Sequence, residues 1–158
     1  MINIALVEPE IPQNTGNIAR LCAAARAPLH IVGAAGFRLD HRAVRRAGLD
    51  YWPEVSIHRH RDMEALYRSL PGARFLYLST KARQPYFEWP FDLDDCLVFG
   101  RETRGLPEEL LRKNGDRCLT IPMLNPKVRS LNLANSVAIV LYEALRQTHA
   151  LSTSSRAS

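Results

Sequence analysis

The feature that most constrains the fold is a series of short apolar runs, separated from one another by turns or by helical patterns. The runs expected to form strands are residues 2–7, 29–32, 75–78, 96–99 and 118–121, with a weaker one at 55–58. Runs of this length without polar alternation are typical of strands that are buried on both faces of a sheet. Strands that alternate with helices predict an α/β fold with a mainly parallel sheet.

Helices are expected between these runs, where apolar residues recur at a spacing of three or four. After a polar turn at residues 8–17, Ile18, Leu21, Cys22 and Ala25 share one face of the first helix. Further helices are expected at residues 41–47, 61–70, 107–113 and from about 133 to 147. The apolar residues of the last helix keep one face, which is therefore expected to be buried.

The chain has 158 residues, of which 46% are hydrophobic and 23% charged, enough for one domain with its own core. That domain is predicted to span residues 1–148, with residues 84–95 as a surface loop and residues 149–158 as a disordered tail. The run at residues 2–7 has no basic lead-in and is too short for a signal peptide. No segment approaches the roughly 18 apolar residues of a membrane span. We therefore expect a cytoplasmic protein that does not contact a membrane.

The cysteines and histidines show no pattern of metal ligands. Cys22, Cys96 and Cys118 lie in apolar segments and are expected to be buried free thiols. His58 and His60 belong to an alternating His/Arg stretch, which is expected to be a solvated basic edge. No metal site is predicted.

The formal net charge of +5 favours an anionic partner, and 18 of the 21 basic residues are arginine. Arginine suits bidentate phosphate contacts and stacking on bases. The same bias also arises from genome composition, so charge alone leaves nucleic-acid binding open.

Three predicted strands end in loops rich in Gly, Pro, Asn, Ser or Thr, after Leu78, Phe99 and Ile121. Carboxyl ends of parallel strands meet at one edge of a sheet, which is the usual ligand side. We expect the loops to offer backbone groups to a flat heterocycle there, with Gly100 allowing a close approach. Gly100 as an ordinary turn residue is an equal alternative. The sequence lacks the GxGxxG and P-loop patterns of the usual nucleotide sites.

Polar residues in these loops also have simple structural explanations. Glu102 and Arg104 are consistent with a local ion pair, which contributes little if it is exposed. Ser130 and Asn132 precede the last helix, where the simplest role is a helix cap. The residue types alone therefore leave the function of these loops open.

Three blocks of sequence together resemble a known family. NTGNIARLCAA at 14–24, LVFGRETRGLP at 97–107 and IPMLNPKVRSLNLANSVAIVLYEALRQ at 121–147 resemble, in this order, the three motifs of the SPOUT superfamily of RNA 2′-O-ribose methyltransferases. The resemblance extends to about residue 147 and is nearest to the small single-domain branch that methylates the wobble nucleotide of tRNA. It implies methylation of the ribose 2′-hydroxyl of cytidine or modified uridine 34, with S-adenosyl-L-methionine (SAM) as the methyl donor.

The resemblance also implies a carboxyl-terminal trefoil knot, the SPOUT fold, and a homodimer that binds SAM in the knot. Periodicity gives no indication of a knot, and the general rule that folds are unknotted would exclude one. Matched position by position, the residues implied at the cofactor are Leu78, Gly100, Ile121, Met123, Ser130 and Leu131. The residues implied in catalysis are Asn14, Arg20, Glu102, Ser130, Asn132 and Tyr142.

The family assigns Arg20 to the reacting hydroxyl, sometimes as the general base. A guanidinium is essentially never deprotonated, so we expect Arg20 to hold the adjacent phosphate and stabilise negative charge on the ribose oxygen. Asn14 is expected to orient the helix of Arg20, and Glu102 to fix Arg20 or the substrate. Tyr142 has an equal alternative as a core or dimer-face aromatic.

The implied partner is the anticodon stem-loop of tRNA, whose single-stranded wobble nucleotide is reached without opening a duplex. Candidate RNA contacts are Arg42, Arg45, Arg46, Arg59, Arg61, Lys127 and Arg129. Close relatives often carry an aspartate-containing loop where this chain has Lys127 and Arg129, which leaves substrate preference open. A ribosomal RNA 2′-O-methyltransferase and a non-catalytic RNA-binding module of the same fold stay as alternatives.

Overall fold

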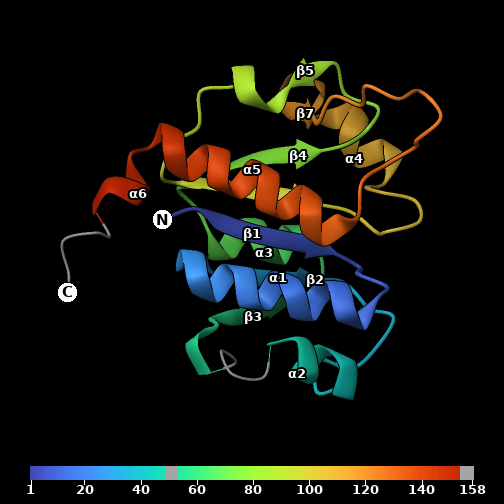
Figure 1. Cartoon of the computed structure of the whole chain (residues 1–158), viewed down its shortest axis with the longest axis vertical. Helices are drawn as coiled ribbons and strands as arrows, with labels where there is room; N and C mark the ends of the chain where they lie inside the picture. The colour runs from blue at the N-terminus through green and yellow to red at the C-terminus, as the bar shows by residue number, and fades with distance from the viewer. Residues whose placement is uncertain (49–52, 154–158) are drawn as a thin grey trace.

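The computed structural model describes residues 1–48 and 53–153, which form a sheet between two layers of helices (Figure 1). Within these residues, seven strands form one parallel sheet in the order β3-β2-β1-β6-β4-β7-β5. The strands are β1 Asn3–Val7, β2 Leu29–Val32, β3 Ile57–His60, β4 Arg74–Leu78, β5 Gln84–Pro85, β6 Asp95–Phe99 and β7 Cys118–Thr120. The predicted α/β class and mainly parallel sheet are confirmed.

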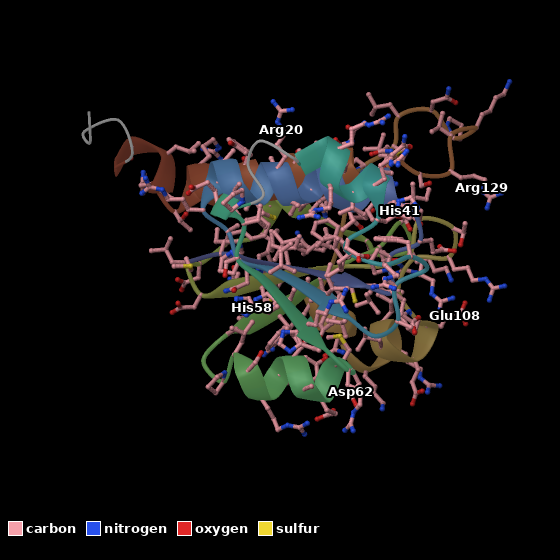
Figure 2. All side chains as sticks on the ribbon, turned by 90° about the horizontal axis from the view of Figure 1, so that it is seen from below. Arg20, His41, His58, Asp62, Glu108 and Arg129 are labelled. Carbon is pink, nitrogen blue, oxygen red and sulfur yellow. The ribbon has the colours of Figure 1, made fainter. Side chains whose placement is uncertain are left out.

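Helices cover both faces of the sheet, which Figure 2 shows edge-on. On one face lie α1 Pro12–Ala25, α2 Arg42–Gly48 and α5 Leu133–Gln147. On the other face lie α3 Met63–Ser69 and α4 Glu108–Lys113. Other helical segments include the 3₁₀ turns η2 Tyr86–Glu88 and η3 Gly115–Arg117, and α6 Ala150–Thr153. Within the described ranges, no helix has the length and apolar character that crossing a membrane requires.

The strands lack polar alternation because both faces of the sheet are buried. In β1, Ile4 and Leu6 belong to the core under α1 and α5, whereas Ala5 and Val7 belong to the core under α3 and α4. Strand β6 alternates between the two cores in the same way. Successive side chains of a strand point to opposite faces, so a central strand must be apolar throughout.

The first and last long helices lie side by side on one face of the sheet (Figure 1). Their buried residues are Ile18, Ala19 and Cys22 on α1 and Val137, Val140, Leu141, Ala144 and Leu145 on α5. These apolar faces pack on the sheet, as the sequence predicts for the last helix. Helix α2 packs across α1 at Gly16, where a Cβ would lie 2.6 Å from both the Ala47 Cβ and the Val44 carbonyl oxygen.

The three cysteines are buried and free, as predicted. Burial raises the pKa of the Cys22 thiol to about 12. Burial also raises the pKa of the Cys96 thiol to about 12, with a smaller contribution from the neighbouring Asp95. Because a thiolate is the nucleophilic form of cysteine, neither thiol is a nucleophile at neutral pH.

Helix α1 begins inside the stretch for which the sequence predicts a polar turn. Pro12 occupies its first position, where the fixed φ of proline fits and the missing N–H breaks no helical hydrogen bond. The N-cap residue, Ile11, has no capping side chain, and the first turn contains no acidic residue. The start of α1 therefore depends on a partner from elsewhere in the chain.

Three other boundaries differ from the sequence prediction. Strand β3 lies at residues 57–60, two residues beyond the predicted start at 55. The predicted loop at 84–95 contributes β5 and η2, and Pro85 is tolerated in β5 because that strand is at the edge of the sheet. Helix α6 replaces the first part of the predicted disordered tail. The rest of that tail, residues 154–158, lies outside the described residues.

A stacked histidine cluster lies on β2 and β3. The ring centroids of His58 and His60 are each 5.1 Å from that of His30. Asn3 donates its side-chain amide to the Met1 carbonyl, which leaves its Oδ1 as the acceptor for Nε2–H of buried His30 over 3.0 Å. With its proton on Nε2, His30 accepts a hydrogen bond at Nδ1 from Nε2–H of His60 over 2.8 Å. The predicted solvated edge is therefore wrong for His60, which is half-buried. No metal-binding group of three or more His, Cys, Asp or Glu side chains occurs among the described residues.

We expect His30 to make the protein about 2 kcal/mol less stable at about pH 5 than at about pH 7.5. Burial, followed by the charges of His60 and His58, lowers the pKa of His30 from 6.5 to about 4. Between these values the unfolded chain binds a proton at this imidazole and the folded chain does not, so stability falls as the pH falls. Urea unfolding at both pH values measures this loss.

The control for this pH dependence is a histidine on the surface. His30→Gln should remove about 2 kcal/mol of the dependence, because an amide does not titrate. His41 is exposed, and His41→Gln should leave the dependence unchanged. An equal pH dependence in the native protein and in His30→Gln would contradict the assignment.

Candidate active site

A cavity of ≈ 280 Å³ opens at the carboxyl ends of β4, β6 and β7. This edge is where open parallel sheets bind ligands. The three strand-end loops that the sequence predicts to converge all contribute to the cavity. Its lining includes every residue that the resemblance implies at the cofactor, namely Leu78, Gly100, Ile121, Met123, Ser130 and Leu131. In Figure 2, Arg129 and Glu108 mark this side of the molecule.

Gly100 starts the tight loop that forms one wall of the cavity. Arg101 and Gly105 pair across this loop, with N–H···O distances of 3.2 and 2.9 Å. A Cβ at position 100 would lie 2.1 Å from the Gly105 carbonyl carbon and 2.2 Å from the Leu106 nitrogen. Position 100 therefore needs glycine because backbone atoms of Gly105 and Leu106 occupy the space that a Cβ would take. This steric requirement is stricter than that of an ordinary turn or of a closely approaching ligand.

Glu102, within that loop, caps the start of α1. Its Oε2 accepts the N–H of Glu10 over 2.8 Å, and its Oε1 accepts the N–H of Ile11 over 3.0 Å. Asn14 also donates its side-chain amide to Oε1, over 3.4 Å. A carboxylate at a helix N-terminus satisfies unpaired N–H groups and interacts favourably with the helix dipole. Glu102 thus supplies the cap that α1 lacks, in place of the local ion pair considered from the sequence.

Asn132 connects this arrangement to α5. Its Oδ1 accepts the N–H of Asn135 over 3.2 Å and so caps α5, a role that the sequence leaves open for Ser130 as well. Its Nδ2 donates to Oδ1 of buried Asn14 over 3.0 Å. Asn14, Glu102 and Asn132, all implied in catalysis, therefore form one hydrogen-bonded chain. This chain joins α1, the loop after β6 and α5.

Four residues that sequence reasoning missed tie the same loop to the segment before α1. Arg101 forms an ion pair with Glu8, with 2.9 Å between Nε and Oε2. Glu10 accepts both the N–H and the hydroxyl of Thr103. The available signal was a pair of carboxylates directly after the first strand, at an edge where backbone N–H groups need partners.

Arg20 and Tyr142 do not line this cavity. Arg20 is exposed on α1, and its side chain points away from the sheet (Figure 2). Tyr142 is 40% exposed on α5, roughly 15 Å along the helix axis from Asn132 at 1.5 Å per residue. The fold thus brings four of the six residues implied in catalysis to or beside the cavity, and leaves these two on the outer helical layer.

The cavity combines apolar walls with a basic rim. Its charged lining residues are Lys81, Arg101, Arg104 and Arg129, with Glu102 as the acidic member. Such a lining suits a ligand that has a flat apolar part and an anionic part. The candidate RNA contacts Arg42, Arg45, Arg46, Arg59, Arg61, Lys127 and Arg129 are all exposed, and Arg129 lies at the cavity.

Known proteins match this chain over nearly its whole length. Residues 1–142 match the SpoU rRNA Methylase family. A tRNA (cytidine(34)-2′-O)-methyltransferase of Saccharophagus degradans is 47% identical over 148 residues, covering 93% of this chain and 96% of the relative. A protein of the same name from Methylovorus glucosotrophus is 45% identical, with the same coverage. The chain therefore belongs to the SpoU rRNA methylase family.

Solved structures share the fold. One that concerns the 2′-OH methylation of C/U34 on tRNA matches with a TM-score of 0.88 at 47% identity, covering 93% of this chain and 95% of that chain. The SpoU methyltransferase AviRb from Streptomyces viridochromogenes, in complex with the cofactor AdoMet, matches with a TM-score of 0.80 at 26% identity. That match covers 92% of this chain and 59% of AviRb.

Proposed function

We propose that the protein transfers the methyl group of SAM to the ribose 2′-hydroxyl of the wobble nucleotide, cytidine or modified uridine, in the anticodon loop of tRNA. The observation that carries this proposal is the cavity into which three loops bring the residues matched to the cofactor. Family membership and the relatives named for the same reaction support it. The ribosomal RNA alternative has weaker support, since a solved rRNA methyltransferase from Sinorhizobium meliloti is 28% identical to this chain, which covers 56% of it.

The lining residues fit SAM as a ligand. Leu78, Ile121 and Leu131 offer apolar surface for the adenine ring, and backbone groups at the strand ends offer hydrogen bonds to its edge. Arg129 and its basic neighbours suit the carboxylate of the amino acid part. When bound, SAM supplies an electrophilic methyl group on a sulfonium centre.

The chain's own residues position the acceptor and stabilise charge. Orientation alone can contribute roughly 7–11 kcal/mol in favourable cases. Glu102, Asn14 and Asn132 serve this purpose, because their hydrogen bonds hold α1, the cavity wall and α5 in one frame. Arg20 holds the phosphate beside the reacting ribose and stabilises negative charge on the 2′-oxygen as its proton leaves. It keeps its own proton throughout.

The reaction is proposed to require a homodimer. Arg20 and Tyr142 are exposed on the layer of α1 and α5, away from the cavity of their own chain. A second copy that packs against this layer supplies Arg20 to the cavity of the first. Sedimentation equilibrium tests the dimer, and a monomer at working concentration would contradict it.

We further propose a trefoil knot in the carboxyl-terminal part of the chain and a cytoplasmic location. The loop after β6 and the segment 121–132 enclose the same cavity, after which α5 returns to pack beside α1. Pulling the two chain ends apart in an optical trap tests the knot, because a knotted chain stops short of the full contour length. Cell fractionation tests the location.

The decisive experiment for the reaction is tritium transfer from labelled SAM into tRNA that lacks ribose methylation at the wobble position. Nuclease digestion and mass spectrometry then locate the label. Arg20→Ala should lower kcat by about 10²-fold, as loss of one stabilising donor does elsewhere. SAM binding should be retained, because Arg20 is proposed to hold the RNA phosphate and to stabilise the ribose oxygen, and not to bind the cofactor.

Arg68→Ala is the matched control, because Arg68 is an exposed arginine on the opposite face of the sheet. It should transfer methyl groups at the native rate. Label that appears in ribosomal RNA and not in tRNA would favour the ribosomal alternative. SAM binding without transfer to any RNA would favour the non-catalytic module.

A further inference from the structure

The cavity loop Arg101–Gly105 has an anchor that the proposed chemistry does not use. Thr103 donates its N–H and its hydroxyl to the same oxygen, Oε1 of Glu10, over 3.1 and 2.7 Å. These hydrogen bonds lower the pKa of Glu10 below its usual value, and the bond from the Thr103 hydroxyl has the larger effect. The carboxylate is therefore charged at neutral pH, and both hydrogen bonds are charge-assisted.

This anchor and the Glu102 cap are reciprocal. Glu102 accepts the N–H of Glu10, while Glu10 accepts the N–H of Thr103, the residue after Glu102. Each segment thus supplies a carboxylate for the backbone of the other, in the manner of a capping box. The two partners are 93 residues apart in sequence. Arg101 adds a third link through its ion pair with Glu8.

The loop needs this support because much of it faces solvent. Thr103, Arg104 and Gly105 are exposed, and the internal pairing of the loop lies at its base, between Arg101 and Gly105. A loop without an outer anchor would have to be ordered by its ligand, which lowers affinity. The anchoring segment leads directly into α1, which carries Arg20.

We propose that Glu10 is a positioning residue for the cofactor, an inference that rests on the proposed function. By holding Thr103, it keeps the Arg101–Gly105 loop in the shape that lines the cavity. Glu10 touches neither the methyl group nor the ribose in this role. Removal of the Glu10 carboxylate should therefore weaken SAM binding. Turnover at saturating SAM should change much less than the affinity for SAM.

The test measures the Kd of SAM by calorimetry, and KM and kcat by methyl transfer to tRNA. Glu10→Ala removes both hydrogen bonds and should raise Kd and KM for SAM about tenfold, with kcat within about twofold of native. Glu10→Gln keeps an oxygen acceptor and should stay within about threefold. Thr103→Val removes the hydroxyl and keeps the N–H, so its Kd and KM for SAM should lie between those of Glu10→Gln and Glu10→Ala. Glu64→Ala, an exposed carboxylate change on α3, is the control and should match the native protein.

Three outcomes would overturn the proposal. They are native SAM affinity in Glu10→Ala, equal losses in the alanine and glutamine variants, and a loss confined to kcat. If circular dichroism shows that Glu10→Ala is unfolded, native affinity in both Thr103→Val and Thr103→Ala overturns the proposal instead. A native protein that does not bind SAM overturns the proposed function itself, whereas one that binds SAM and methylates tRNA leaves only the role of Glu10 at stake.

Discussion

The variant Gly100→Ala is expected to raise the Kd of SAM by at least about 100-fold, a loss of about 2.7 kcal/mol of binding free energy. The added Cβ would lie 2.1 Å from the Gly105 carbonyl carbon and 2.2 Å from the Leu106 nitrogen. Backbone atoms cannot rotate away as a flexible side chain does, so the whole Arg101–Gly105 loop must move. That movement changes the cavity wall and pulls Glu102 from the start of α1. Overpacking of this kind also costs about 1–3 kcal/mol of stability.

Gly72→Ala is the matched control for this change. A Cβ at position 72 meets no atom within 4 Å, so the free energy of unfolding should change by less than about 1 kcal/mol. Calorimetric titration with SAM and urea unfolding of both variants provide the comparison. Native affinity in Gly100→Ala would contradict the role of this loop as a wall of the cofactor site.

Asp95→Ala is expected to lower the free energy of unfolding by about 3 kcal/mol, the lower end of what breaking a buried ion pair costs. Asp95 is fully buried, and its two oxygens accept Nε and Nη2 of Arg74 over 2.7 and 2.8 Å. The N–H of Asp92 donates to the same carboxylate over 2.7 Å. Removal of the carboxylate leaves Nε of Arg74 and the N–H of Asp92 without this acceptor, whereas Nη2 of Arg74 keeps the Pro90 carbonyl. The loss is at the lower end because the Arg74 side chain is 35% exposed and water can reach it.

Asp40→Ala is the control, because it removes a similar two-point contact from the surface. Arg38 donates Nε and Nη2 to Asp40 over 3.1 and 3.2 Å, but the two side chains are 86% and 61% exposed. Exposed pairs contribute about 0–1 kcal/mol, so urea unfolding should show little change in this variant. Equal losses in the two variants would mean that burial does not set the strength of the Asp95 pair.

The sheet and its helices were largely predictable because both depend on local periodicity. Continuous apolar runs identified the central strands, and spacing of three or four identified the buried face of α5. The short edge elements were not predictable in the same way. Residues 84–88 form β5 and η2 without an apolar pattern, because β5 is held by its pairing with β7.

The cavity was also predictable in outline. Parallel strands put their carboxyl ends at one edge, so the loops after Leu78, Phe99 and Ile121 had to approach one another. The motif resemblance then named the residues that line the cavity. Neither kind of reasoning reached Glu10 or Thr103: the carboxylates after the first strand show a need for partners, but the sequence does not indicate a partner 93 residues away.

The sequence by itself determined the fold class, the buried faces of the main elements and the edge of the sheet that carries the site, because those properties follow from residue type and spacing. The tertiary structure decided which polar groups meet there. It assigned Glu102 to the start of α1, made Gly100 a point of contact between backbone segments and left Arg20 on the outer layer. The first two outcomes depend on the pairing of strands β1 and β6, which lie side by side in the sheet although they are far apart in the chain, and the third depends on the face of α1 that packs on the sheet.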